Sequence, residues 1–106
     1  MTDKLQILKD LKNHLVRYYN KPIRDIILFG SQAAGAAKMN SDFDVLIVLE
    51  NDYNIKDENT IINLCYNIDL KNNIVIDAHL ISQSEINSLR GKQPIYIKAI
   101  NNGIYV

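Results

Sequence analysis

The chain has one cysteine, two prolines, no tryptophan and no excess of charge of either sign. A single cysteine excludes an internal disulfide and favours a reducing, cytoplasmic location. The 12 basic and 12 acidic residues cancel, which argues against a free-standing nucleic-acid-binding protein because such proteins carry a basic face. No apolar stretch approaches the ~20 residues that span a bilayer, and the N-terminus lacks a signal-peptide pattern, so neither a membrane span nor secretion is expected.

What remains is an ordinary globular composition of 106 residues, and we expect residues 1–106 to form a single domain. Apolar residues at three- and four-residue spacing, or in short unbroken runs, predict the elements. The expected helices cover residues 3–19 and 57–71, with short ones after residues 31, 82 and 94, and the expected strands cover 23–29, 45–49 and 74–81. This order predicts an α/β (α+β) fold with a small mixed sheet of three or slightly more strands, flanked by helices.

Cys65 lies in the apolar stripe of the helix expected over residues 57–71, together with Ile61, Leu64 and Ile68. A cysteine in such a stripe behaves as a small apolar side chain. We therefore interpret Cys65 as a core residue and not as a nucleophile.

Polar residues stand at both ends of the loop between the first two strands. Gly30-Ser31 follows one strand and opens a helix, a setting in which backbone N–H groups bind phosphate. Asp42 and Asp44 precede the apolar strand, and residues two apart on a strand point to the same face. Two adjacent carboxylates repel each other unless a cation lies between them, and oxygen ligands suit Mg²⁺ or Mn²⁺.

A third carboxylate, Asp77, lies inside the otherwise apolar third strand, where an unpaired charge is costly. If that strand pairs beside the second one, Asp77 shares a face with Asp42 and Asp44. Each feature also has a plainer interpretation: the two aspartates as a solvated turn, and Asp77 as an edge-strand acid facing water. Their joint arrangement favours metal-assisted chemistry on a phosphate ester. His79 shares the face of Asp77 and is either a rim histidine or a contact of the nucleotide or of a metal ligand.

Gly30-Ser31, ten residues, and then Asp42-Phe43-Asp44 resemble the signature of the minimal nucleotidyltransferases of the polymerase beta superfamily. Ala33, Gly35 and Ser41 fit the longer form of this signature. The resemblance implies a mixed sheet with flanking helices and two Mg²⁺ or Mn²⁺ ions on the catalytic residues Asp42, Asp44 and Asp77. It also implies nucleotide binding at Gly30, Ser31 and Ser41.

Many proteins of this family and size resemble the antitoxin of HEPN toxin–antitoxin pairs. That resemblance implies transfer of AMP from ATP onto a tyrosine of a HEPN-domain RNase toxin. A protein acceptor also suits the balanced charge better than a free nucleic acid does. A haloacid-dehalogenase phosphatase is disfavoured because its Asp-x-Asp follows a strand, and a P-loop NTPase because no Gly-Lys-Ser/Thr triplet occurs.

One position departs from the family pattern. Ala34 stands where the family usually has arginine, whose forked donors suit a nucleotide or a partner. Its absence leaves a second possibility open, a weakly active or inactive domain of the same fold that neutralises its partner by binding alone.

Overall fold

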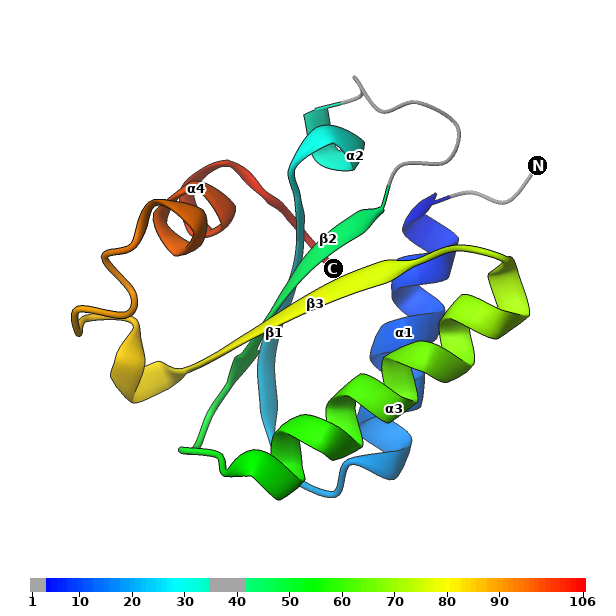
Figure 1. Cartoon of the computed structure of the whole chain (residues 1–106), viewed down its shortest axis with the longest axis horizontal. Helices are drawn as coiled ribbons and strands as arrows, with labels where there is room; N and C mark the ends of the chain where they lie inside the picture. Colours follow the sequence, from blue (N-terminus) through cyan, green and yellow to red (C-terminus); the bar gives the residue numbers. More distant parts are fainter. Residues whose placement is uncertain (1–3, 35–41) are drawn as a thin grey trace.

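The computed structural model describes residues 4–34 and 42–106. Helices alternate with strands along the chain (Figure 1). The elements are α1 (Lys4–Tyr18), β1 (Ile23–Phe29), α2 (Ser31–Ala34), β2 (Phe43–Leu49), α3 (Ile55–Asn72), β3 (Ile76–Ser82), the 3₁₀ helix η1 (Gln83–Glu85), α4 (Pro94–Asn102) and β4 (Ile104–Tyr105). None of the helices in these two ranges is long and apolar enough to cross a membrane.

The four strands form one mixed sheet in the order β3-β2-β1-β4. β1 pairs antiparallel with β2 and with β4, whereas β2 and β3 are parallel. The end of β1 therefore lies beside the start of β2, and the starts of β2 and β3 lie side by side. This arrangement confirms the predicted mixed sheet flanked by helices, and it brings three chain segments together at one end of the sheet.

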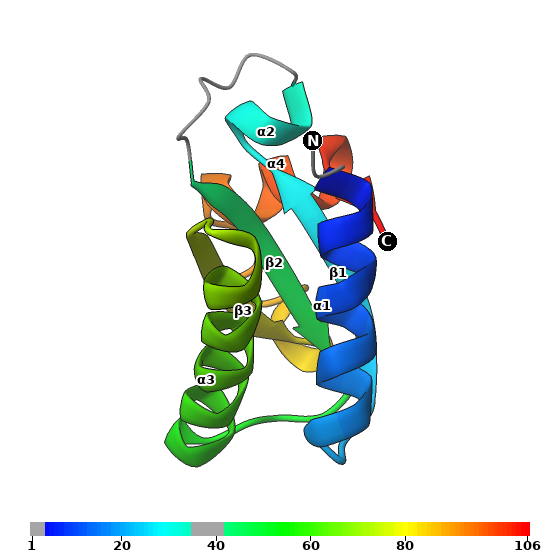
Figure 2. The same ribbon diagram turned by 90° about the vertical axis from the view of Figure 1, so that its right-hand side faces the viewer.

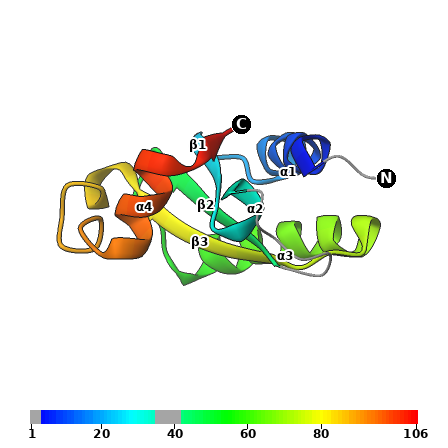
Figure 3. The same cartoon turned by 90° about the horizontal axis from the view of Figure 1, so that it is seen from above.

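The two faces of the sheet are covered differently. α1 and α3 lie side by side on one face, and α4 lies on the other (Figures 2 and 3). The residues of β2 alternate accordingly: Val45 and Ile47 pack under α1 and α3, while Leu46 and Val48 pack toward α4. By the same alternation Phe43 belongs to the first core and Asp44 to the α4 face.

The connection from α3 to β3 fixes where β3 begins. Asn73 ends α3 in the left-handed conformation, with φ 54°, and its N–H bonds the carbonyl of Asp69. The Asp69 carboxylate accepts the N–H of Ile76 at 2.9 Å. Because Ile76 is the first residue of β3, this bond holds the strand just before Asp77.

Several details differ from the expectations. β2 begins at Phe43 and not at Val45, because Phe43 is buried and pairs with Ile76. The apolar spacing within residues 3–19 predicts Leu5 and Tyr18 on the buried face of the helix, but both are exposed. Ile7 in α1 and Tyr19 just after it are buried instead. β4 was not predicted, since two exposed residues carry no pattern.

Cys65 is buried, and burial followed by the nearby charge of Asp69 raises the pKa of its thiol to about 12. The interpretation as a core residue is confirmed. Because the thiolate is the reactive form, we expect native protein to react with a disulfide reagent at least about a hundredfold more slowly than protein unfolded in guanidinium. Absorbance of the released thiol measures both rates. Equal rates would contradict a buried, protonated Cys65.

Candidate active site

The end of β1 lies directly against the start of β2. Phe29 is the register partner of Asp44, so Gly30 follows at the level of the Asp44 carboxylate. Gly30 has a φ of +74°, and a Cβ built on it would overlap Oδ2 of Asp44. Glycine at position 30 thus permits both the turn into α2 and the close approach of the carboxylate.

Asp44 and Asp77 are register partners on the parallel strands β2 and β3. The third strand therefore does pair beside the second, which was the condition for Asp77 to share a face with Asp44. Asp44 is half-buried, whereas the Asp77 side chain is 55% exposed. Further along β3 the same face closes, and Ile81 is fully buried beneath α4. The two carboxylates therefore lie at the open end of the α4 face.

A histidine completes this group. Among the described residues, donor atoms of Asp44, Asp77 and His79 lie within 4.8 Å of one another. Nε2 of His79 is 3.5 Å from Oδ2 of Asp77, and the His79 ring packs against Phe29 with centroids 5.6 Å apart. β2 and β3 thus provide one compact polar cluster beside the end of β1, which we call the acidic cluster (Asp44, Asp77, His79).

The charge of the acidic cluster is unbalanced without a cation. Partial burial raises the pKa of Asp44, and the negative charges of Asp77 and Asp42 raise it further, while His79 acts in the opposite direction. The folded chain thus disfavours the charged form of the carboxyl that Gly30 approaches.

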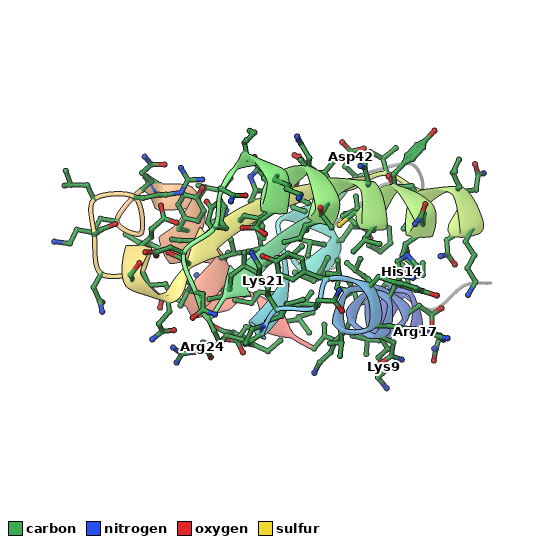
Figure 4. The ribbon with its side chains drawn as sticks, turned by 90° about the horizontal axis from the view of Figure 1, so that it is seen from below. Lys9, His14, Arg17, Lys21, Arg24 and Asp42 are labelled. Atoms are coloured by element: carbon green, nitrogen blue, oxygen red, sulfur yellow. The ribbon has the colours of Figure 1, made fainter. Side chains whose placement is uncertain are left out.

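Asp42 is placed differently from the other two aspartates. It is exposed, precedes the first residue of β2, and is not part of the acidic cluster in the described chain. Its charge nevertheless raises the pKa of both Asp44 and Asp69, so it lies near the rim of the site. In the view of Figure 4, Asp42 lies at the opposite edge of the molecule from the basic side chains Lys9 and Arg24.

The donors present fit a divalent cation. Two carboxylates and an imidazole are ordinary ligands of such ions, and close carboxylates are tolerated where a cation neutralises them. The absence of a side chain at Gly30 lets the Asp44 carboxylate lie against the backbone of residue 30. The residues therefore fit an ion between Asp44 and Asp77.

The nucleotidyltransferase domain family matches residues 8–106. The chain belongs to the nucleotidyltransferase family. The match spans every strand and the whole acidic cluster. A relative in Methanocaldococcus jannaschii, named "Putative protein adenylyltransferase MJ0604", is 38% identical over 80 residues, which are 76% of this chain and 75% of that protein.

Two solved structures share the fold of this nucleotidyltransferase. The spectinomycin adenyltransferase AAD(9) of Enterococcus faecialis, crystallised with ATP and spectinomycin, superposes with a TM-score of 0.64 at 22% identity. That match covers 81% of this chain but only 37% of the other, so the present chain corresponds to a part of it. A toxin–antitoxin complex with AMP-PNP matches with a TM-score of 0.59 at 18% identity, over 92% and 70% of the two chains.

The remaining predicted residues of the nucleotidyltransferase signature fall at or beyond the edge of the described chain. Ser31 begins α2 and Ala34 ends it. Gly35 and Ser41 lie outside the described residues.

Two residues near the site received little or no weight from the sequence. The sequence leaves His79 as either a rim histidine or a contact of the nucleotide or of a metal ligand, and it gives no prediction for Asp69. A negative charge in the last turn of a helix is unfavourable because the helix dipole is negative at that end. The position of Asp69 in the last turn of α3 was therefore the one sequence feature that indicated a role for it. The contact of His79 with Phe29 joins residues 50 positions apart and left no local trace in the sequence.

Proposed function

We propose that residues 1–106 form one domain that transfers AMP from ATP onto a tyrosine of a HEPN-type RNase toxin, and that the chain thereby acts as an antitoxin. The observation that carries this proposal is the pairing of Asp44 with Asp77 beside the turn at Gly30. The name of the Methanocaldococcus jannaschii relative supports a protein acceptor.

Asp44 and Asp77 would hold one divalent ion, and Asp42, at the rim, would join Asp44 in holding a second. Mg²⁺ or Mn²⁺ there would neutralise phosphate charge and make the acceptor hydroxyl more acidic. Backbone N–H groups at Gly30 and Ser31 would bind the phosphates, with Ser41 as a further nucleotide contact. Rigid pairing of β2 with β3 keeps the two carboxylates in place before substrate arrives, which lowers the cost of binding.

The reaction exchanges a phosphoanhydride bond of ATP for a phosphate ester bond on the tyrosine. The tyrosine oxygen attacks the α-phosphorus of ATP and forms a new P–O bond, and the bond from the α-phosphorus to the bridging oxygen breaks. Pyrophosphate leaves with the electron pair of that bond. The tyrosine proton would pass to the Asp77 carboxylate, which is the more exposed of the paired acids.

The alternative is a domain that binds its partner without transferring AMP. The observation in its favour is Ala34 at the end of α2, where the family usually provides an arginine. Both alternatives predict a complex with the toxin, and only one predicts covalent modification.

The two are separated by incubating the chain with α-labelled ATP, Mg²⁺ and the protein encoded next to it, tested as the candidate toxin. We expect label on the toxin, a mass increase of one AMP on a tyrosine, and loss of RNase activity. The Asp42→Ala/Asp44→Ala variant is expected to transfer no label because the ion ligands are gone. Intact-mass spectrometry and autoradiography measure the transfer.

A stable complex without label would establish the binding-only alternative. The variant Ala34→Arg tests whether the missing arginine at position 34 limits the activity. We expect it to increase the rate of transfer, because a forked cation near the phosphates stabilises the charge of the transition state. An unchanged rate would show that arginine at this position is not needed here.

A further inference from the structure

His79 stands on the same face of the sheet as the two paired acids. It lies two residues after Asp77 on β3, and its register partner on β2 is Leu46, two residues after Asp44. Its side chain is 26% exposed, so part of the ring is accessible to solvent. The imidazole is thus positioned directly behind the pair of carboxylates.

The ring is held in place on two sides. Phe29, which is buried at the end of β1, packs on it with an angle of 55° between the ring planes. Oδ2 of Asp77 lies 3.5 Å from Nε2 on the other side. An imidazole fixed in this way loses little further conformational freedom on binding a ligand.

Donor atoms around one divalent ion, each roughly 2.0–2.2 Å from it, are separated by about 3–4 Å. The donor atoms of Asp44, Asp77 and His79 lie within 4.8 Å of one another, so small side-chain rotations bring them to that separation. The 3.5 Å between Nε2 and Oδ2 already falls in this range. The Asp44 carboxylate lies against Gly30, where a side chain would collide with it.

We propose that His79 is a nitrogen ligand of the ion held by Asp44 and Asp77, and that it makes this site prefer Mn²⁺ to Mg²⁺. The proposal rests on the proposed function only in requiring that an ion binds between these two acids. Mg²⁺ takes oxygen ligands almost exclusively, whereas imidazole is a good ligand for first-row transition ions and Mn²⁺ accepts both donor types. One imidazole among carboxylates therefore shifts the choice of ion without abolishing Mg²⁺ binding.

The test uses protein with ¹⁵N-labelled histidine and adds Mn²⁺, with and without AMP-PNP. Electron spin-echo modulation detects nitrogen bound to Mn²⁺, and the isotope separates histidine from adenine nitrogen. We expect a ¹⁵N signal in the unaltered chain and none in His79→Phe, which keeps a ring against Phe29. Titration calorimetry should show the ratio of the Mg²⁺ to the Mn²⁺ dissociation constant falling about tenfold in that variant.

The chain's other histidine provides the matched control. His14 lies on α1 against Tyr18 and Asn67, apart from the acidic cluster, so His14→Phe should keep the ¹⁵N signal and the metal preference. Mn²⁺ bound without a histidine signal, or an unchanged metal preference in His79→Phe, would overturn this proposal and leave the proposed function intact. Absence of any bound ion, even with AMP-PNP, would overturn both.

Discussion

Replacing Asp44 by asparagine is expected to abolish nucleotidyl transfer while making the ion-free fold at least as stable as before. Asp44 is the centre of the site, since it pairs with Asp77, lies against Gly30 and faces His79. Loss of its charge removes an electrostatic contribution of several kcal/mol, and about 4 kcal/mol corresponds to roughly a thousandfold in rate. We therefore expect at least about a thousandfold loss in kcat/KM.

The stability effect follows from the direction of the pKa shift. The pKa of Asp44 is raised in the folded chain by burial and by the charges of Asp77 and Asp42. Because the pKa of Asp44 is higher in the folded than in the unfolded chain, protonation of this carboxyl favours the folded state. This contribution to the free energy of unfolding is complete below the pKa of the unfolded chain and is lost as pH rises through the folded-state pKa. At neutral pH the carboxylate is therefore destabilising, and asparagine removes the cost.

Thermal unfolding at several pH values, with and without Mg²⁺ or Mn²⁺, measures this effect. Without added ions we expect the Tm of Asp44→Asn to equal or exceed that of the unaltered chain at neutral pH, and the difference to vanish in acid. Added ions should raise the Tm of the unaltered chain only, because an ion stabilises the state that binds it. A lower Tm for the variant at neutral pH without ions would show that Asp44 already has a compensating partner.

Part of this site was predictable because its signals are local. Gly30-Ser31 and the two aspartates stand at fixed spacing around one loop, and alternation along a strand predicts that Phe43 and Asp44 face opposite ways. That Asp77 is the partner of Asp44 could be predicted only on the condition that the third strand pairs with the second. The pairing with Asp77 depends on β2 and β3 being parallel neighbours, which joins residues 33 positions apart.

Other features escaped prediction for identifiable physical reasons. Aspartate is disfavoured in strands, so the expected start of β2 fell after Asp44, whereas pairing with β3 extends the strand back to Phe43. The position of Asp42 outside the acidic cluster depends on where that strand begins. In α1 the apolar positions outnumber those that one face can bury, and packing against α3 and the sheet selects Ile7 over Leu5.

Gly30 provides the second large effect, because one added methyl group tests the position of Asp44 directly. In Gly30→Ala the new Cβ would overlap Oδ2 of Asp44, and residue 30 would keep a positive φ. Left-handed backbone costs a residue with a side chain about 1–2 kcal/mol, and each kcal/mol lowers the Tm of a domain of this size by roughly 4–8 °C. Displacement of the carboxylate should also reduce transfer by at least about a hundredfold, because a shift of ~1 Å in a catalytic group has an effect of that size.

The variant Asn73→Ala separates the loss of stability caused by backbone strain from the loss of transfer caused by displacement of Asp44. Asn73 has nearly the same left-handed backbone, with φ 54°, but it is exposed at the end of α3. This control should lose a similar amount of stability through backbone strain and keep full transfer activity, as thermal unfolding and the labelled-ATP assay would measure. Full activity in Gly30→Ala would mean that the working enzyme does not hold Asp44 against residue 30. If Gly30→Ala and Asn73→Ala lost the same amount of activity, lower stability alone would explain the loss. Of these two residues, only residue 30 contacts a carboxylate of the acidic cluster.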